Sequence, residues 1–228
     1  MAAAHPDPRV LVYTRTTAYS HDSIPDGIAA IRFLGAAHGF TVYTTEDPES
    51  FDAPLDPYAA VVFLSISGDV LTPAGRAHLA AYIEVGGGFG GVHAAACTEY
   101  DWPYYGKLLG AGFVRHPDYQ PGKLLVEDRE HPATQHLPTV WEFTDEWYDF
   151  RASPRDSVRV HASADESSYD GGGMGDDHPL VWCREQGSGR VFHTALGHAS
   201  EAYTQDRQDL AVVGGQRGLV AGLAAVRG

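Results

Sequence analysis

The sequence GGGFGGVHAAA at residues 86–96 carries the strongest fold signal in the chain. We interpret Phe89–Val92 as a buried central strand, because neither face of this segment has a polar side chain. The glycines before it favour a turn out of a helix, since glycine adopts positive φ at little cost. Gly90 and Gly91 within the strand indicate that another backbone or a ligand approaches closely. His93 is then expected at the carboxyl end of the strand, where open α/β sheets bind their ligands.

Three apolar segments before this stretch are predicted to be further strands: Arg9–Thr14, Phe40–Thr44 and Ala59–Leu64. Helices are expected to begin near Ser23 and Thr72, whose side chains can cap a first turn. Strands that alternate with helices indicate a mostly parallel sheet with helices on both faces. Right-handed crossovers bring the loops after such strands to one edge of the sheet, so His21, Ser65 and His93 should lie near one another.

The second half of the chain is less regular. Strands are predicted at Lys123–Glu127, Val158–Ser163, Leu180–Arg184 and Arg190–Ala195. The glycine-rich turn between the last two indicates a hairpin. We expect His116 in a loop, and the segment Trp141–Phe150 combines aromatic side chains with acidic ones, among them Asp145 and Glu146.

Length and composition fit one folded domain. The chain has 228 residues, of which 43% are hydrophobic and 11% aromatic, which is enough for a packed core. There is no internal repeat and no clear domain boundary. We therefore expect a single domain over residues 1–228, with residues 1–8 disordered and residues 206–228 forming a closing helix.

Charge and cysteine content narrow the range of partners. The net charge of −14, from 16 basic and 30 acidic residues, argues against nucleic acids and anionic membrane surfaces. No apolar run approaches the roughly 20 residues that span a bilayer. Met1–Pro6 lacks the features of a signal peptide, and Cys97 and Cys183 are too few for a disulfide framework. We expect a cytoplasmic protein whose partner is a small molecule, and we leave open whether it forms a homo-oligomer.

Six segments match a known family pattern in the same order along the chain. They are residues 19–25 (YSHDSIP), 86–98 (GGGFGGVHAAACT), 112–117 (GFVRHP), 145–148 (DEWY), 178–182 (HPLVW) and 187–198 (GSGRVFHTALGH). With these segments the chain resembles the ThuA-like, or trehalose utilisation, family of the class I glutamine amidotransferase-like superfamily. The resemblance implies an α/β fold, a flavodoxin-like three-layer α/β/α sandwich with a mostly parallel central sheet. It also implies a role in disaccharide or 3-keto-glycoside metabolism.

The chain departs from the amidotransferases of that superfamily at one position. Their turn after the strand carries a nucleophilic cysteine where this chain has His93. Cys97 comes later, where a helix is expected to begin, and cannot take the same place. We therefore do not expect glutamine hydrolysis through a thiolate, and we keep a hydrolase that uses Cys97 as a minor alternative.

A single histidine after a strand is more often a core residue bonded to a carbonyl group than a functional one. Here several histidines in strand-end loops are expected at one edge of the sheet, beside acidic residues and a tyrosine, which favours a functional site. We predict catalytic roles for His93, His21, Glu146 and Asp145, and substrate-binding roles for His116, His198, Glu99, Tyr148 and Ser65.

Histidine beside a carboxylate suits two kinds of chemistry. One is general acid–base catalysis on a sugar hydroxyl or carbonyl group, because imidazole titrates near neutral pH. The other is binding of Zn²⁺ or a similar divalent ion, for which His21, His93 and His116 are the candidate ligands. No HxH or HExxH spacing is present, so a metal site would be assembled from distant loops.

The acidic and aromatic candidates also have structural explanations. Asp145 and Glu146 could form a solvated helix end, but the aromatic residues around them indicate burial. A buried carboxylate needs a partner, for which Arg115 or one of the histidines is available. The aromatic segment 102–105 (WPYY) is more simply explained by packing than by a stacking platform for a sugar ring.

We expect an enzyme, a hydrolase or lyase acting on glycosides, that cleaves a keto-sugar or disaccharide derivative by acid–base chemistry, with or without a metal ion. Cleavage beside a carbonyl group needs proton transfer and carbonyl polarisation but no covalent nucleophile. The alternative is a non-catalytic sugar-binding or partner subunit of a sugar oxidoreductase system.

Overall fold

The computed structural model describes residues 8–204. The predicted closing helix at 206–228 and the first seven residues of the predicted disordered segment 1–8 lie outside the described residues. Within residues 8–204, no helix has the length and apolar character that crossing a membrane requires.

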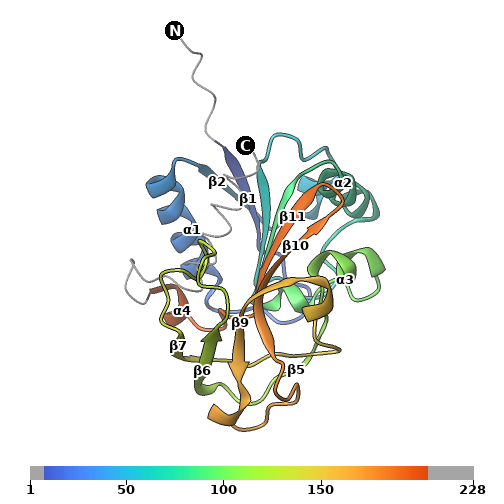
Figure 1. Ribbon diagram of the computed structural model, residues 1–228. Coiled ribbons are helices and arrows are strands. Elements are labelled where there is room, and N and C mark those ends of the chain that lie inside the picture. The colour runs from blue at the N-terminus through green and yellow to red at the C-terminus, as the bar shows by residue number, and fades with distance from the viewer. Residues whose placement is uncertain (1–7, 205–228) are drawn as a thin grey trace.

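The centre of the molecule is a nine-stranded sheet with the order β2-β1-β3-β4-β11-β10-β9-β6-β7 (Figure 1). The parallel half of the sheet consists of β2 (Thr41–Thr45), β1 (Arg9–Tyr13), β3 (Ala60–Leu64), β4 (Gly88–Val92) and β11 (Gly189–Thr194). The antiparallel half consists of β10 (Pro179–Gln186), β9 (Arg159–Asp165), β6 (Gln120–Val126) and β7 (Val140–Asp145). The hairpin predicted from the glycine-rich turn is the pair β10–β11.

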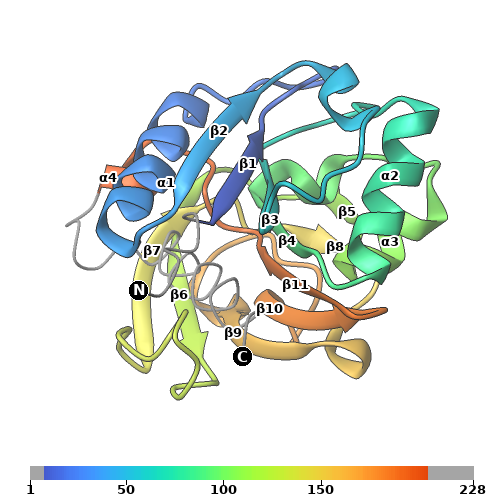
Figure 2. The same ribbon diagram turned by 90° about the horizontal axis from the view of Figure 1, so that it is seen from above.

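Helices lie on both faces of this sheet (Figure 2). One face carries α1 (Ile24–His38) and α4 (Glu201–Thr204), and the other carries α2 (Pro73–Glu84) and α3 (Pro103–Leu109). The short 3₁₀ helices are η1 (Pro48–Phe51), η2 (His93–Cys97), η3 (Arg155–Ser157) and η4 (Glu166–Ser168). The expected three-layer α/β/α fold is confirmed, with the difference that only the half of the sheet from β2 to β11 is parallel.

A second, two-stranded sheet pairs β5 (Phe113–Arg115) with β8 (Asp149–Phe150) in antiparallel orientation. We expected a loop before His116, but this segment forms β5 because it finds a partner in β8, far along the chain. His116 therefore leaves directly from the end of a strand.

Local signals account for the helix ends in the parallel half. Thr72 caps α2, since its hydroxyl oxygen accepts a hydrogen bond from the N–H of Gly75 at 2.9 Å. Gly39 ends α1 with a φ of +74°. Ser23 precedes α1 as expected but does not cap it, because its hydroxyl donates to the carbonyl oxygen of Gly197 at 3.4 Å.

The core beneath β4 explains the glycines and supports the turn that follows the strand. A Cβ atom on Gly91 would lie 2.8 Å from Cδ1 of Leu109, so a side chain approaches this glycine closely, where the sequence predicted a backbone or a ligand. Phe63 stacks on Tyr105 of α3 with ring centroids 5.9 Å apart. Burial of each such ring contributes about 1.5–3 kcal/mol. The Tyr105 hydroxyl donates to the carbonyl oxygen of Ala95 at 2.8 Å and so fixes η2.

Candidate active site

Two neighbouring strands of the parallel half end in the same uncommon backbone conformation. His93 follows β4 with a φ of +51°, and Ser65 follows β3 with a φ of +48°. Residues other than glycine rarely adopt this left-handed conformation, because Cβ comes too close to the following carbonyl oxygen. Both side chains are completely buried. The sharp turn brings the imidazole of His93 to the loop that carries His21, as the sequence predicted.

Hydrogen bonds determine which nitrogen of His93 carries the proton. Its Nδ1 lies 2.8 Å from the carbonyl oxygen of Ala195, and a carbonyl oxygen can only accept, so Nδ1 is the protonated nitrogen. In the neutral form of the ring, the lone pair therefore lies at Nε2. This nitrogen lies 3.1 Å from Nε2 of His21 and 2.9 Å from the hydroxyl oxygen of Tyr148.

His21 comes from the loop between β1 and α1 and packs edge-on against His93, with ring centroids 4.7 Å apart. Its side chain is almost completely buried. Burial, and after it the neighbouring His93 and His198, lowers the pKa of His21 to about 3. The imidazole of His21 is therefore neutral near pH 7.

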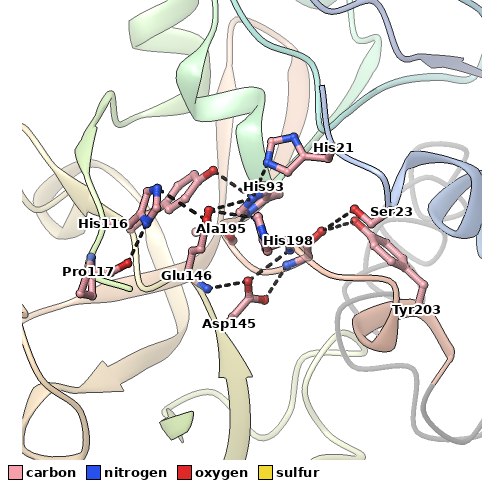
Figure 3. A network of polar contacts seen from close by, with 12 residues as sticks. His21, Ser23, His93, His116, Pro117, Asp145, Glu146, Ala195, His198 and Tyr203 are labelled. Carbon is pink, nitrogen blue, oxygen red and sulfur yellow. Dashed lines mark hydrogen bonds and ion pairs between the residues drawn. The ribbon is translucent and has the colours of Figure 1, made fainter. Parts of the chain in front are cut away.

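Glu146 follows β7 and brings a carboxylate to these imidazoles. Its Oε2 lies 3.1 Å from Nδ1 of His198 and 3.6 Å from Nε2 of His93. Burial alone would raise the pKa of Glu146, but the contacts with His198 and His93 outweigh it and hold this pKa well below its usual range. The same contact with Glu146 raises the pKa of His198. We refer to His21, His93, His198 and Glu146 as the histidine–glutamate cluster (Figure 3).

Asp145, the last residue of β7, lies beneath the cluster and is completely buried. Its carboxylate accepts hydrogen bonds from the N–H groups of Glu146, Gly197 and His198, at 2.8, 2.7 and 3.2 Å. Burial raises its pKa. The helix-end explanation is wrong because Asp145 ends a strand. Of the two expected kinds of partner for these acidic residues, Arg115 forms its ion pair elsewhere, and histidines contact Glu146. Asp145 thus holds Glu146 and His198 in position, whereas the orienting role that we expected of it was towards His93 and His21.

Tyr148 and His116 extend the cluster towards solvent. The ring of Tyr148 lies against those of His93 and His116, with centroids 4.5 and 5.7 Å away. Burial raises the pKa of Tyr148 well above its usual value, so the hydroxyl stays protonated. Nδ1 of His116 lies 2.7 Å from the carbonyl oxygen of Pro117 and therefore carries a proton, and its Nε2 lies 3.6 Å from Oε1 of Glu146. The His116 side chain is 35% exposed, so a ligand can reach it.

Glu99 does not join the site. It follows η2 with a φ of +53°, and its carboxylate lies against the segment before α2. Oε1 accepts hydrogen bonds from the N–H groups of Val70 and Leu71, both at 2.9 Å, and Oε2 lies 2.6 Å from the guanidinium of Arg76. Its position does not support the predicted substrate-binding role, because both carboxylate oxygens are already engaged.

The donor atoms of the cluster are close enough to share a metal ion. Ring nitrogens of His21, His93 and His198 and a carboxylate oxygen of Glu146 all lie within 4.8 Å of one another. The sequence suggested His116 as the third histidine ligand, but the structure groups His198 with the other two. His116 instead contacts the opposite oxygen of Glu146.

The loop that carries His198 is braced by contacts that the sequence did not reveal. The hydroxyl of Tyr203 donates to the carbonyl oxygen of Gly197 at 3.0 Å, next to the longer hydrogen bond from Ser23. Figure 3 shows both side chains beside this loop. No signal in the sequence distinguishes these residues, because each contributes a common side chain to a backbone acceptor.

Cys97 is not an activated nucleophile. Burial raises the pKa of its thiol to about 12, so the thiol is protonated near neutral pH. Its environment therefore argues against a hydrolase that uses this cysteine.

A pocket of about 460 Å³ opens beside His21 at the ends of β1 and β2. Its lining is mostly polar and consists of Thr14, Arg15, Thr16, Ser20, His21, Asp22, Ile24, Pro25 and Glu46. Hydroxyl, guanidinium and carboxylate groups can all form hydrogen bonds with ligand hydroxyl groups.

Elsewhere, Trp102 stacks on Tyr104 and Tyr105, so packing accounts for these aromatic rings.

The chain matches a family model described as ThuA, trehalose utilisation, over residues 9–217. No curated protein matches the sequence. Among solved structures, a ThuA-like protein from Bacteroides uniformis is 27% identical, with a TM-score of 0.78 over 96% of this chain and 94% of that one.

Other solved structures share the fold. A ThuA-like protein from Parabacteroides merdae is 22% identical, with a TM-score of 0.72 over 95% of this chain and 91% of that one. A β-galactosidase from Bacillus circulans is 11% identical, with a TM-score of 0.58, and the match covers 99% of this chain but 32% of that one. At these identities the likeness concerns the fold alone.

Proposed function

Because the chain belongs to the ThuA, trehalose utilisation, family, we propose that it is an enzyme of carbohydrate metabolism whose active site is the histidine–glutamate cluster. The observation that carries the proposal is the convergence of buried imidazoles and a carboxylate from distant loops. Burying several ionisable groups against one another is costly for the fold, and active sites are where such arrangements are concentrated.

The reaction that we propose is cleavage of a keto-sugar or of a keto derivative of a disaccharide. A base removes the proton from the carbon next to the carbonyl group, and the electron pair forms an enolate. The enolate electrons then expel the glycosidic oxygen from the following carbon, while an acid donates a proton to the leaving oxygen. Release of the unsaturated product makes the enzyme a lyase, and addition of water across the new double bond makes the net reaction a hydrolysis.

Residues of the site suit the separate parts of this reaction. In its neutral form His116 has its lone pair at the accessible Nε2, which suits the base. The Tyr148 hydroxyl stays protonated and can donate a hydrogen bond to the oxygen that becomes negative. The cluster lies on the inner side of Tyr148, where the substrate carbonyl group would be polarised.

The pocket beside His21 supports a carbohydrate as the substrate class. Its hydroxyl groups and its mixture of Arg15 with Asp22 and Glu46 match a neutral ligand rich in hydroxyl groups better than an anion. The same pocket also suits the alternative, a sugar-binding subunit without catalytic activity.

Turnover of the 3-keto derivative of trehalose by the purified full-length chain tests the proposal. We expect His93→Ala to lower kcat/KM by at least about 100-fold. The matched control is His38→Ala, at the exposed end of α1, which should leave kcat/KM unchanged. Equal turnover by the His93→Ala variant would rule out this site, and sugar binding without turnover by the unmodified chain would favour the sugar-binding subunit.

A further inference from the structure

We infer that the histidine–glutamate cluster binds one divalent transition-metal ion, with His21, His93, His198 and Glu146 as its ligands. Three imidazole nitrogens and one carboxylate oxygen are a donor set that suits Zn²⁺. The catalytic role of the ion rests on the proposed function, but the existence of the site does not.

The tautomer of His93 is the first argument. Because Nδ1 donates to the carbonyl oxygen of Ala195, the lone pair of Nε2 lies inside the cluster, 3.1 Å from Nε2 of His21. His93 is completely buried and His21 is 6% exposed. Two imidazole nitrogens that face each other out of water need a proton or a metal ion between them. A nearby carboxylate adds negative charge and favours the doubly charged ion.

The spacing of the donor atoms is the second argument. Ligand atoms that bind Zn²⁺ tetrahedrally at about 2.0–2.2 Å lie roughly 3.3–3.6 Å from one another. In the cluster the separations are 3.1 Å between His21 and His93, 3.6 Å between His93 and Glu146, and 3.1 Å between Glu146 and His198. These three separations are close to those of a coordination shell, and all four donor atoms lie within 4.8 Å of one another.

The groups behind the ligands are the third argument. Metal-binding histidines usually donate their other N–H to a carbonyl or carboxylate oxygen, which orients the ring. Ala195 does this for His93. A single oxygen of Asp145 accepts hydrogen bonds from the N–H groups of both Glu146 and His198, and so fixes two ligands from different parts of the chain.

Two other groups within residues 8–204 have candidate donor atoms close together: His131, His161 and Cys183, and Asp149, Glu166 and His178. In the first group, Nδ1 of His131 accepts a hydrogen bond from the N–H of Ala133, so its Nε2 keeps the proton. In the second, Asp149 already forms an ion pair with Arg115 at 2.7 Å. Neither group offers donors as readily available as those of the cluster.

When bound, the ion would supply the Lewis acidity that polarises the substrate carbonyl group. Proton transfer then falls to His116, which lies outside the ligand set. Tyr148 competes with the ion for the lone pair of His93, so Tyr148→Phe is expected to bind the ion at least as tightly as the unmodified chain.

The test uses the full-length chain without an affinity tag, treated with a chelator and then equilibrated with Zn²⁺ or Co²⁺. We expect one equivalent of Zn²⁺ by elemental analysis, and visible absorption bands from Co²⁺ bound by nitrogen and oxygen. His198→Ala and Glu146→Gln should each weaken Zn²⁺ binding by at least about tenfold, while His116→Ala, the matched control, should change it less than twofold. Circular dichroism verifies that each variant is folded, and Glu146→Gln preserves shape if His198→Ala does not fold.

Unchanged Zn²⁺ affinity in folded Glu146→Gln protein would overturn the inference. So would loss of binding in His116→Ala with retention in His198→Ala, or a sulfur-to-cobalt charge-transfer band, which would place the ion at Cys183. Turnover by a chain shown to hold no metal ion would overturn the catalytic role of the ion and leave the proposed enzyme standing. One tightly bound ion without turnover would support the metal site and count against the enzyme.

Discussion

The two halves of the central sheet contribute different chemical groups to one site. The parallel half supplies the imidazoles of His21 and His93, which follow buried strands. The antiparallel half supplies the carboxylate of Glu146 and the hydroxyl of Tyr148, which follow its edge strand β7. The end of β7 reaches the loop after β11, since Asp145 accepts a hydrogen bond from Gly197 at 2.7 Å. The site is therefore complete only when both halves have folded against each other.

The largest effect should follow from removing the contact that joins the halves. Asp145→Ala leaves one buried and two half-buried N–H groups without an acceptor, so we expect a loss of about 4 kcal/mol in the free energy of unfolding. Metal affinity should fall as well, because Glu146 and His198 lose their shared support. Urea denaturation measures the first effect. A loss below about 1 kcal/mol would mean that the two halves are held together by other contacts.

A smaller effect should arise within the antiparallel half, from pH. Burial lowers the pKa of His161 to about 4 from its ordinary value of 6.5. The unfolded chain thus takes up this proton at a higher pH than the folded chain, so His161 stabilises the fold fully above pH 6.5, and this contribution is lost as the pH falls towards 4. The expected loss is about 3 kcal/mol, and His161→Gln should flatten this part of the curve. Identical pH profiles for both chains would show that His161 does not titrate in this range.

The parallel half contains a buried carboxylate, that of Glu99, whose contacts are with Val70, Leu71 and Arg76 rather than with the cluster. Glu99→Gln weakens the contact with Arg76, because it replaces one of the two buried carboxylate oxygens by an amide group. We therefore expect a loss of about 2 kcal/mol in the free energy of unfolding, with kcat/KM unchanged. Thermal denaturation and turnover are measured on the same preparation. A large fall in kcat/KM without a loss of stability would show that Glu99 contributes to the active site.

The smallest effect concerns the packing under β4. Gly91→Ala introduces a Cβ atom 2.8 Å from Leu109 and 3.0 Å from Nδ1 of His193, so we expect a loss of about 1.5 kcal/mol in the free energy of unfolding. Gly106→Ala, in α3, meets no atom within 4 Å and should stabilise the chain by about 0.5–1 kcal/mol. Chemical denaturation of the pair separates close packing from helix propensity, and equal shifts would contradict the packing argument.

The sequence predicted the parallel half better than the antiparallel half, for a physical reason. Strands buried on both faces, such as β3 and β4, are continuously apolar and recognisable in isolation. Because parallel strands end at one edge, the approach of His21 to His93 followed from their positions alone. Strand β5 could not be predicted in this way, because three residues become a strand only when a distant partner is available.

The remaining parts of the site depend on contacts that leave no pattern in the sequence. The partners of Asp145 are backbone N–H groups, which every residue except proline carries. Glu99 points away from the site because its backbone is left-handed, and the neighbouring residues in the sequence do not predict this conformation. Whether His116 or His198 approaches His93 more closely is decided by the path of two loops, and loop paths are fixed by tertiary packing.

The left-handed corner at His93 has an evolutionary consequence. The left-handed turn is a property of the backbone. A different side chain at this position would therefore occupy the same place in the site without a change in the fold. Cysteine stands there in the amidotransferases that the sequence resembles, whereas the thiol of this chain lies further along and is protonated. A substitution at position 93 therefore changes the reactive group that this turn presents to the site while the backbone of the turn stays the same.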